Sequence, residues 1–172
     1  MFMRKINILL LALAALAVNG AVIPVESYKF DAPVLPEKRN SFEDKEFKKL
    51  TDGDPSGKSR VIWEYKKSPK YRINITFKLK ESGVSKVYLD IFRGPKSYGI
   101  KEVKLFAIVD GKKVEAASKL FKHPYELGAN DKHYEKLTVE VPETAPKAAD
   151  YELTITGTGS YLGLCEVSFE KK

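Results

Sequence analysis

The chain has 172 residues, and 30 Lys and Arg against 23 Asp and Glu give it a formal net charge of +7. One cysteine excludes an internal disulfide framework, and the lysines are scattered among acids instead of forming a nucleic-acid-binding patch. The sequence contains no glycine-rich phosphate loop, H-E-x-x-H motif or G-x-S-x-G elbow. We therefore expect no nucleic-acid partner and no catalytic activity.

The first twenty residues have the pattern of a secretory signal peptide. Arg4 and Lys5 precede an unbroken run of eleven apolar residues, 8–18, and small residues follow the run. A bilayer core requires about 20 apolar residues, so the run favours a signal peptide over the alternative, an uncleaved membrane anchor. We place the cleavage after Gly20, with Ala21 as a second possibility. The mature chain is then expected to be secreted, or periplasmic in a Gram-negative bacterium, without a transmembrane segment.

The mature chain is predicted to form one domain. Residues 1–20 carry two positive charges and no acid, so their removal lowers the formal charge to +5. About 150 residues remain, which is the size of a single domain. We divide them into an extended lead-in at 21–27 and a domain at 28–172. Cys165 lies in an apolar run and is expected to be a buried, unreactive thiol.

Beyond a turn-rich segment at 51–59, apolar and polar residues alternate with a period of two, which is typical of half-buried strands. Asp110-Gly111 separates two such runs and predicts a tight hairpin. These alternating segments lie at 73–79, 87–92, 103–109, 112–117, 137–141, 151–155 and 162–169. Seven or eight short strands with Gly- and Pro-rich turns predict an all-β sandwich or barrel.

The order of several motifs resembles that of the galactose-binding-like superfamily. This superfamily includes discoidin or coagulation-factor type C domains, family 32 carbohydrate-binding modules and fucose-binding lectins. The motifs are Leu50-Thr51-Asp52-Gly53, the strand at 73–79, Tyr98-Gly99-Ile100, the hairpin at 103–111 and Leu164-Cys165-Glu166-Val167. The resemblance covers about residues 28–170, and it implies an eight-stranded antiparallel jelly-roll β-sandwich.

The resemblance also implies a structural Ca²⁺ ion beside the Asp-Gly turn. Its ligands would be the carbonyls of Lys49 and Cys165 together with Asp52, Asp54, Ser56 and Glu166. Ca²⁺ takes six to eight oxygen ligands, and closely spaced aspartates in a glycine-assisted turn supply them. Glu166 lies in an apolar run, where a carboxylate requires a cation or hydrogen bonds. The alternative is that the two aspartates only cap the turn and Glu166 lies on a solvated face.

Sugar-binding members of the superfamily hold their ligand among loops at one end of the sandwich. The corresponding positions here are Arg93, Tyr98, Tyr161, Trp63 and Glu64, with Glu64 at the position of a family histidine. A pyranose needs an aromatic platform for its apolar face and charged side chains for its hydroxyls. Tyr161 lies between two glycines and offers such a platform, and Arg93 offers a guanidinium group. His123, Tyr125 and His133 occupy another loop that can add contacts.

Together these features predict a secreted, non-catalytic domain that binds a glycan or a cell-surface glycoconjugate. The alternative is a structural or protein-interaction domain at the cell surface, whose partner would be another extracellular protein, because a fold alone does not determine function. Phospholipid binding is a third possibility, for which the loop tip at 158–162 offers only Tyr161 and Leu162 as apolar groups.

Overall fold

The structure is a computed structural model. It describes residues 20–31, 44, 46–55, 60–64, 72–92, 100–121, 134–157 and 161–172, with Glu64 and Tyr134 described by backbone only. Within these ranges, no helix has both the length and the hydropathy that crossing a membrane requires. Several sequence predictions lie outside the described residues, namely the signal peptide before Gly20 and the residues Ser56, Arg93, Tyr98, His123, Tyr125 and His133.

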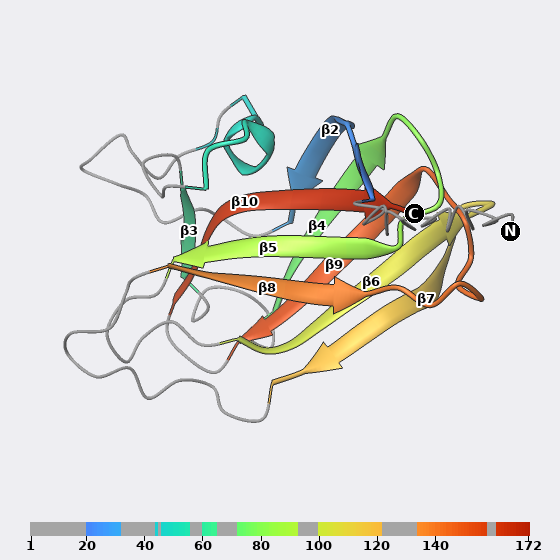
Figure 1. Ribbon diagram of the computed structural model, residues 1–172. Helices are drawn as coiled ribbons and strands as arrows, with labels where there is room; N and C mark the ends of the chain where they lie inside the picture. Colours follow the sequence, from blue (N-terminus) through green and yellow to red (C-terminus); the bar gives the residue numbers. More distant parts are fainter. Residues whose placement is uncertain are drawn as a thin grey trace, which may run out of the picture.

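In the described part of the chain, ten strands form two five-stranded antiparallel sheets that pack face to face (Figure 1). The strands are β1 (Ala21–Ile23), β2 (Val25–Phe30), β3 (Val61–Glu64), β4 (Arg72–Leu79), β5 (Lys86–Phe92), β6 (Ile100–Val109), β7 (Lys112–Leu120), β8 (Tyr134–Glu140), β9 (Asp150–Gly157) and β10 (Tyr161–Lys171). The β10 sheet has the order β1-β10-β5-β8, with β3 also paired to β10, and the β9 sheet has the order β2-β4-β9-β6-β7. The predicted all-β sandwich is confirmed.

The first described strands join both sheets. Strand β1 pairs with the end of β10 through Ala21 and Lys171, whereas β2 pairs with β4 in the other sheet. Pro24 lies between them, and its carbonyl accepts a hydrogen bond from the Lys80 N–H (3.0 Å). The Ile23 side chain is buried in the core. The segment expected as an extended lead-in, 21–27, is therefore extended but belongs to the sandwich.

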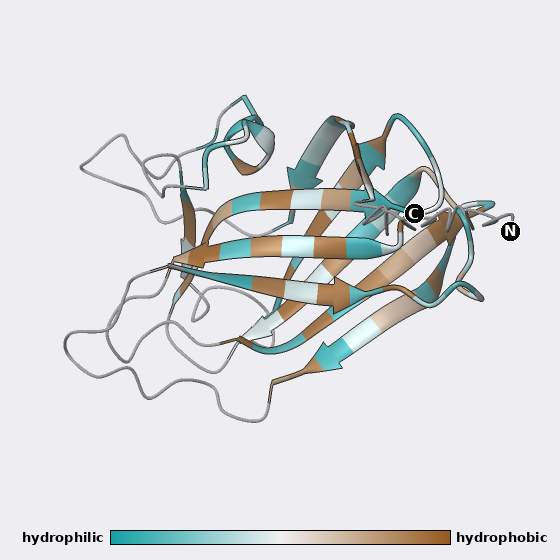
Figure 2. Ribbon diagram, viewed as in Figure 1, coloured by the Kyte–Doolittle hydropathy of each residue, from teal (hydrophilic) through white to brown (hydrophobic). Residues whose placement is uncertain are grey.

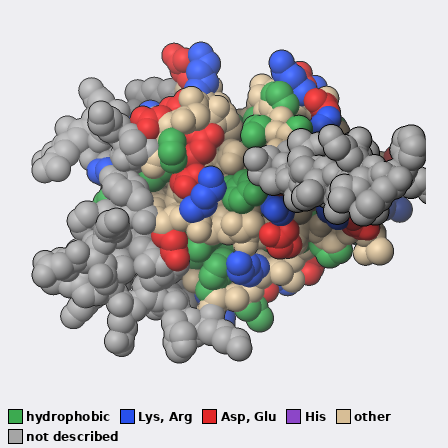
Figure 3. Space-filling view, viewed as in Figure 1, with side chains coloured by type: hydrophobic (Ala, Val, Ile, Leu, Met, Phe, Trp, Pro, Cys, Tyr) green, Lys and Arg blue, Asp and Glu red, His purple; other side chains and the backbone are tan. Residues whose placement is uncertain are grey.

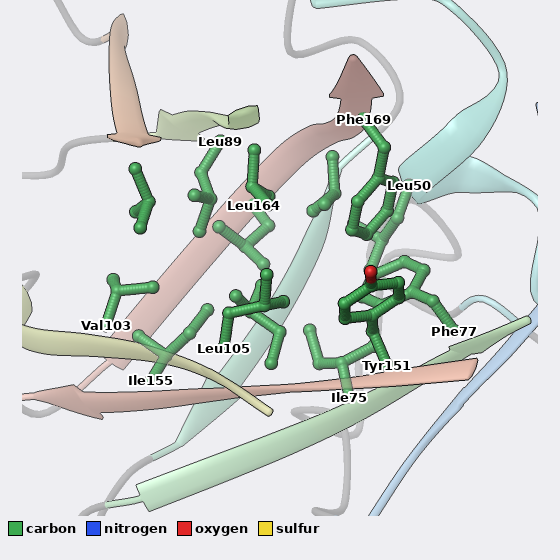
Figure 4. Packing of buried hydrophobic residues seen from close by; sticks show 14 of the residues in the cluster. Leu50, Ile75, Phe77, Leu89, Val103, Leu105, Tyr151, Ile155, Leu164 and Phe169 are labelled. Atoms are coloured by element: carbon green, nitrogen blue, oxygen red, sulfur yellow. The ribbon is translucent and has the colours of Figure 1, made fainter. Parts of the chain in front are cut away.

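One hydrophobic core fills the space between the sheets (Figure 4). Alternate residues of β4, including Ile75 and Phe77, are fully buried, and they face Leu164 and Phe169 of β10. The Phe77 and Phe169 rings meet edge to face, with centroids 5.0 Å apart. The strands therefore show alternating hydrophobic and hydrophilic positions along their length (Figure 2), because successive side chains point to opposite faces of a sheet.

The outer face of the β10 sheet carries interspersed basic and acidic side chains (Figure 3). Tyr88 lies on this face and donates a hydrogen bond to Glu170 (3.0 Å), while the Lys136 ammonium lies 4.7 Å from the centre of the Tyr88 ring. Lys86 also pairs with Glu170 (3.6 Å). Such partly exposed pairs contribute about 0–1 kcal/mol each, so this face is a solvated surface of mixed charge.

The β6–β7 hairpin turns at Asp110 and Gly111, as the sequence predicts. Both residues have positive φ angles, 50° and 73°, and Val109 pairs with Lys112 across the turn. This conformation is that of a type I′ turn, whose twist matches the twist of paired strands.

Leu153 is fully buried in the central strand β9, so Leu153→Ala is expected to lower the free energy of unfolding by about 2–5 kcal/mol. Urea denaturation measures this loss. The matched control is Leu120→Ala on the edge strand β7, because Leu120 is 68% exposed and surface substitutions change stability by about 0.5 kcal/mol or less. Equal losses in the two variants would contradict the assignment of the core.

Candidate functional site

A buried tyrosine fixes the turn that precedes β3. The Tyr28 hydroxyl donates a hydrogen bond to the Asp44 carboxylate and accepts one from the Leu50 N–H (2.9 Å). Burial, and then the hydrogen bond to Asp44, raise the pKa of Tyr28 well above its ordinary value, so the phenol stays neutral. Leu50 is itself fully buried. The turn is therefore anchored to the sandwich by one polar and one apolar contact.

Asp44 also organises the backbone of this turn. Its carboxylate accepts hydrogen bonds from the N–H groups of Lys48 (2.9 Å) and Lys49 (3.3 Å). These groups lie at the start of the 3₁₀ helix η1 (Lys49–Thr51), where N–H groups lack partners within the helix. The helix leads directly into Asp52, so the Tyr28–Asp44 contact determines where the predicted metal-binding turn lies.

Four carboxylates gather where this turn meets β10, and we call them the acidic cluster: Asp52, Asp54, Asp90 and Glu166. The Gly53 N–H donates a hydrogen bond to Glu166 Oε2 (3.2 Å), and the Asp54 N–H donates one to Asp52 Oδ1 (2.9 Å). Asp90 of β5 is the strand partner of Glu166. The turn and the strand predicted to share a metal are therefore in direct contact.

A β-bulge in β10 brings Glu166 into the cluster. Leu164 pairs with Ile91 and Glu166 with Asp90, so Cys165 is an extra residue in β10. A bulge of this kind shifts the alternation of side chains by one position. Leu164 and Val167 both lie in the core, and Glu166 is directed away from it although only 8% of the residue is exposed.

Burial dominates the electrostatics of this region. It raises the pKa of Glu166 from 4.5 to about 7, the Gly53 N–H opposes the rise, and the other three carboxylates of the cluster add to it. Burial also raises the pKa of the Cys165 thiol to about 12. Because the thiolate is the nucleophilic form, Cys165 is inert, in agreement with the sequence interpretation.

The donor set suits calcium only in part. Asp52, Asp54 and Glu166 supply hard oxygen ligands of the kind that Ca²⁺ prefers. However, no three His, Cys, Asp or Glu side chains of the described residues are arranged around a common point. The carbonyl groups of Lys49 and Cys165 belong to η1 and β10, the two segments that are in contact here. Ser56 is outside the residues that the structure describes. The structure thus brings the predicted segments together without forming a closed coordination shell from side chains alone.

The described residues of the predicted ligand site, Trp63, Glu64 and Tyr161, lie where β3, β5 and β10 meet at one end of the β10 sheet. Tyr161 opens β10 and pairs directly with Glu64 of β3. Phe92 ends β5 and pairs with Gly163, and Arg93 is the next residue in the sequence. A Cβ atom at Gly163 would lie 3.0 Å from the Phe92 Cβ, so glycine allows the close approach of these strands. Tyr161 is half-buried.

Trp63, the third predicted contact in this region, is buried. The ring is fully inaccessible and packs edge-on against Phe30, with centroids 5.2 Å apart. Its indole N–H has no hydrogen-bond partner in the described part of the chain. The indole therefore belongs to the core, beneath the strand end that carries Tyr161 and Glu64.

A contact that the sequence did not reveal lies beside this end. The Arg60 guanidinium is 4.4 Å from the centre of the Phe92 ring, a distance typical of a cation–π interaction. The two residues precede β3 and end β5, strands that pair with opposite edges of β10. No local sequence pattern reports such a contact, because it depends on the pairing of three strands.

Comparisons with known proteins support the fold. No family model matches the chain, and no curated protein matches it. Among solved structures, CpGH89CBM32-5 from Clostridium perfringens, in complex with GalNAc-β-1,3-galactose, matches with a TM-score of 0.59 and 17% identity over 87% of this chain and 99% of that one. The family 32 module of C. perfringens NanJ, in complex with galactose, gives 0.57 and 14% over 86% and 96%.

A third similar structure is the family 32 module of AlyQ in complex with 4,5-unsaturated mannuronic acid. Its TM-score is 0.53 and its identity 14%, over 87% of this chain and 97% of that one. At these identities the similarity shows the fold. The chain therefore has the galactose-binding-like β-sandwich fold that the order of its motifs implies.

The raised pKa of Glu166 predicts a pH-dependent stability in calcium-free buffer. The folded protein binds the proton more tightly than the unfolded chain, so this contribution is complete below pH 4.5 and disappears as the pH rises through 7. The free energy of unfolding should fall by about 3 kcal/mol across this window. Denaturation of the wild type and of Glu166→Gln, with chelator present, measures the difference. An identical pH profile for both proteins would contradict the burial of an ionisable Glu166.

Proposed function

We propose that this chain is a secreted, non-catalytic carbohydrate-binding domain that recognises a glycan at the end where β3, β5 and β10 meet. One structural observation supports the position of the site: Tyr161 and Glu64 are paired at the strand ends. The likeness to family 32 modules, whose structures contain galactose, GalNAc-galactose or an unsaturated mannuronic acid, supports the ligand class. The N-terminal signal-peptide pattern supports secretion.

In this proposal each side chain has a distinct role. The Tyr161 ring stacks on the apolar face of a pyranose, as aromatic side chains do in polar binding sites. Glu64 accepts hydrogen bonds from sugar hydroxyls, and Arg93 and Tyr98 donate them. Trp63 supports the site from the core, because its ring is buried below the strand end.

We also infer a structural calcium ion at the acidic cluster. Asp52, Asp54, Ser56 and Glu166, with the carbonyls of Lys49 and Cys165, would hold it. What supports this is a carboxylate that is only 8% exposed and whose pKa three nearby acids raise further. When bound, Ca²⁺ supplies the positive charge that offsets the burial of Glu166 and ties η1 to β10.

Tyr161→Ala is expected to weaken glycan binding about tenfold, because the stacking platform is lost. A glycan array identifies the ligand, and calorimetry with the best hit measures the change. Tyr88→Ala, which removes a tyrosine on the outer face of the β10 sheet, is the matched control and should bind normally. An empty array with folded protein, or equal losses in the two variants, would contradict the proposal, and the empty array would favour a protein-interaction role.

Calcium is expected to raise the melting temperature of the wild type, since a ligand at 100 times its Kd adds about 2.7 kcal/mol of stability. Glu166→Ala should abolish the calcium-dependent rise. Glu170→Ala, in the same strand, is the control that retains it. Differential scanning calorimetry with calcium and with chelator makes the comparison, and superimposable wild-type curves would rule the site out.

A further inference from the structure

Position 20, directly before β1, is enclosed by the end of β10. A Cβ atom added at Gly20 would collide with the Lys171 carbonyl oxygen and would lie 2.5 Å from both Cγ and Oε1 of Glu170. Only a residue without a side chain therefore fits here while β1 is paired with β10. The Gly20–Ala21 bond, where we place the signal-peptide cleavage, thus lies directly beside the Glu170 side chain.

The residues that follow this bond belong to the folded sandwich from the first one onward. Strand β1 pairs with β10 along its whole length, beginning with Ala21 opposite Lys171. The Ile23 side chain is only 1% exposed and lies in the core. Chain termini are poorly ordered unless they are tied down in this way. Cleavage after Gly20 would therefore create an N-terminus with a fixed position in the sheet.

The Glu170 carboxylate has room for a further cation on its β1 side. One row crosses four strands of the β10 sheet through Glu140, Lys86, Glu170 and Val22. Lys86 is thus shared by two acids, and its ammonium lies 3.6 Å from Glu170 Oε1. Tyr88 donates one hydrogen bond to Glu170 Oε2 (3.0 Å), whereas the neighbour on β1, Val22, carries no charge. A carboxylate accepts about four hydrogen bonds, so these contacts do not exhaust Glu170.

The limited exposure of Glu170 makes a second positive charge effective there. Its side chain is only 17% exposed, and charges interact more strongly where water is partly excluded. We propose that the α-ammonium group which cleavage creates at Ala21 binds the Glu170 carboxylate and holds β1 on the sandwich. This inference rests on the proposed secretion, because the Ala21 nitrogen is an uncharged amide before cleavage.

The cleavage reaction supplies the charge at the required place. Signal peptidase hydrolyses the Gly20–Ala21 amide with one water molecule, so Gly20 leaves with a carboxylate and Ala21 keeps the amine. An α-amine has a pKa of about 8 and is therefore mostly protonated at neutral pH. Its nitrogen is two bonds away from the position of the Gly20 Cα, which packs against Glu170. The domain is thus more stable after removal of the signal peptide than before it.

Acetylation of the N-terminus of the secreted protein tests this contact. Mass spectrometry of the protein secreted from its full-length precursor should show Ala21 as the first residue. Acetic anhydride at about pH 6.5 modifies the α-amine ahead of the lysines, whose pKa is near 10.4. The acetyl group restores the carbonyl and Cα carbons of Gly20 but carries neither a charge nor a Cβ atom. We expect the melting temperature to fall by about 2 °C.

Two variants and a second measurement assign this fall to the contact with Glu170. In Glu170→Gln, acetylation should leave the melting temperature unchanged. Glu140→Gln removes the other acid that shares Lys86 and is the matched control, in which acetylation should still lower it. Hydrogen exchange needs no variant: acetylation of the wild type should speed exchange of the β1 amides about fivefold and leave the β9 amides unchanged.

The possible failures are distinguishable. A precursor that remains uncleaved in the cells would contradict the proposed secretion together with this inference. Secreted protein that begins at a residue other than Ala21 would overturn the inference alone. So would an unchanged melting temperature and unchanged β1 exchange after acetylation, or an equal fall in the wild type and Glu170→Gln.

Discussion

Strand β10 must bury one set of side chains in the core and still present a carboxylate outside it, and the extra residue at Cys165 makes both possible. Without the bulge, the alternation that buries Leu164 would also turn Glu166 toward the core and would turn Val167 and Phe169 out of it. The same strand pairs with β1, β3 and β5. The core, the acidic cluster and the proposed sugar-binding end of the sheet therefore all depend on the register of β10.

In the acidic cluster, packing places the Glu166 carboxylate where its charged form is unfavourable. The Tyr28–Asp44 contact positions η1, and η1 brings Asp52 next to Glu166. Desolvation then penalises the charged form of a carboxylate already near other acids. A proton relieves this penalty at low pH, and the proposed calcium ion would relieve it at higher pH. The proposed calcium site and the predicted loss of stability with rising pH are therefore two consequences of one arrangement.

Periodicity in the sequence was sufficient to predict the long strands and the Asp110-Gly111 turn, because both are encoded in neighbouring residues. It did not assign β1 to the sheet, since three residues carry no measurable period, and only pairing with Lys171 defines their role. The Tyr28–Asp44 contact and the rows of neighbouring side chains across the β9 sheet were also hidden. Both join residues distant in sequence, and Asn74, Thr154 and Lys104 become neighbours only through strand register. The predicted site residues that the structure describes lie in two regions, the acidic cluster and the end of the β10 sheet. Trp63 lies in the second region, but it is a buried residue of the core.

Sugar recognition at the end of the β10 sheet is the central functional claim, and it concerns particular backbone positions. A titration of the ¹⁵N-labelled mature domain with its glycan, followed by amide chemical shifts, tests it most directly. Saturable shifts should concentrate in Tyr161 to Gly163 and Val61 to Glu64, the paired strand ends. Spectra that do not change for any glycan, or shifts confined to the opposite end of the sandwich around Ser82 to Ser85, would contradict the claim.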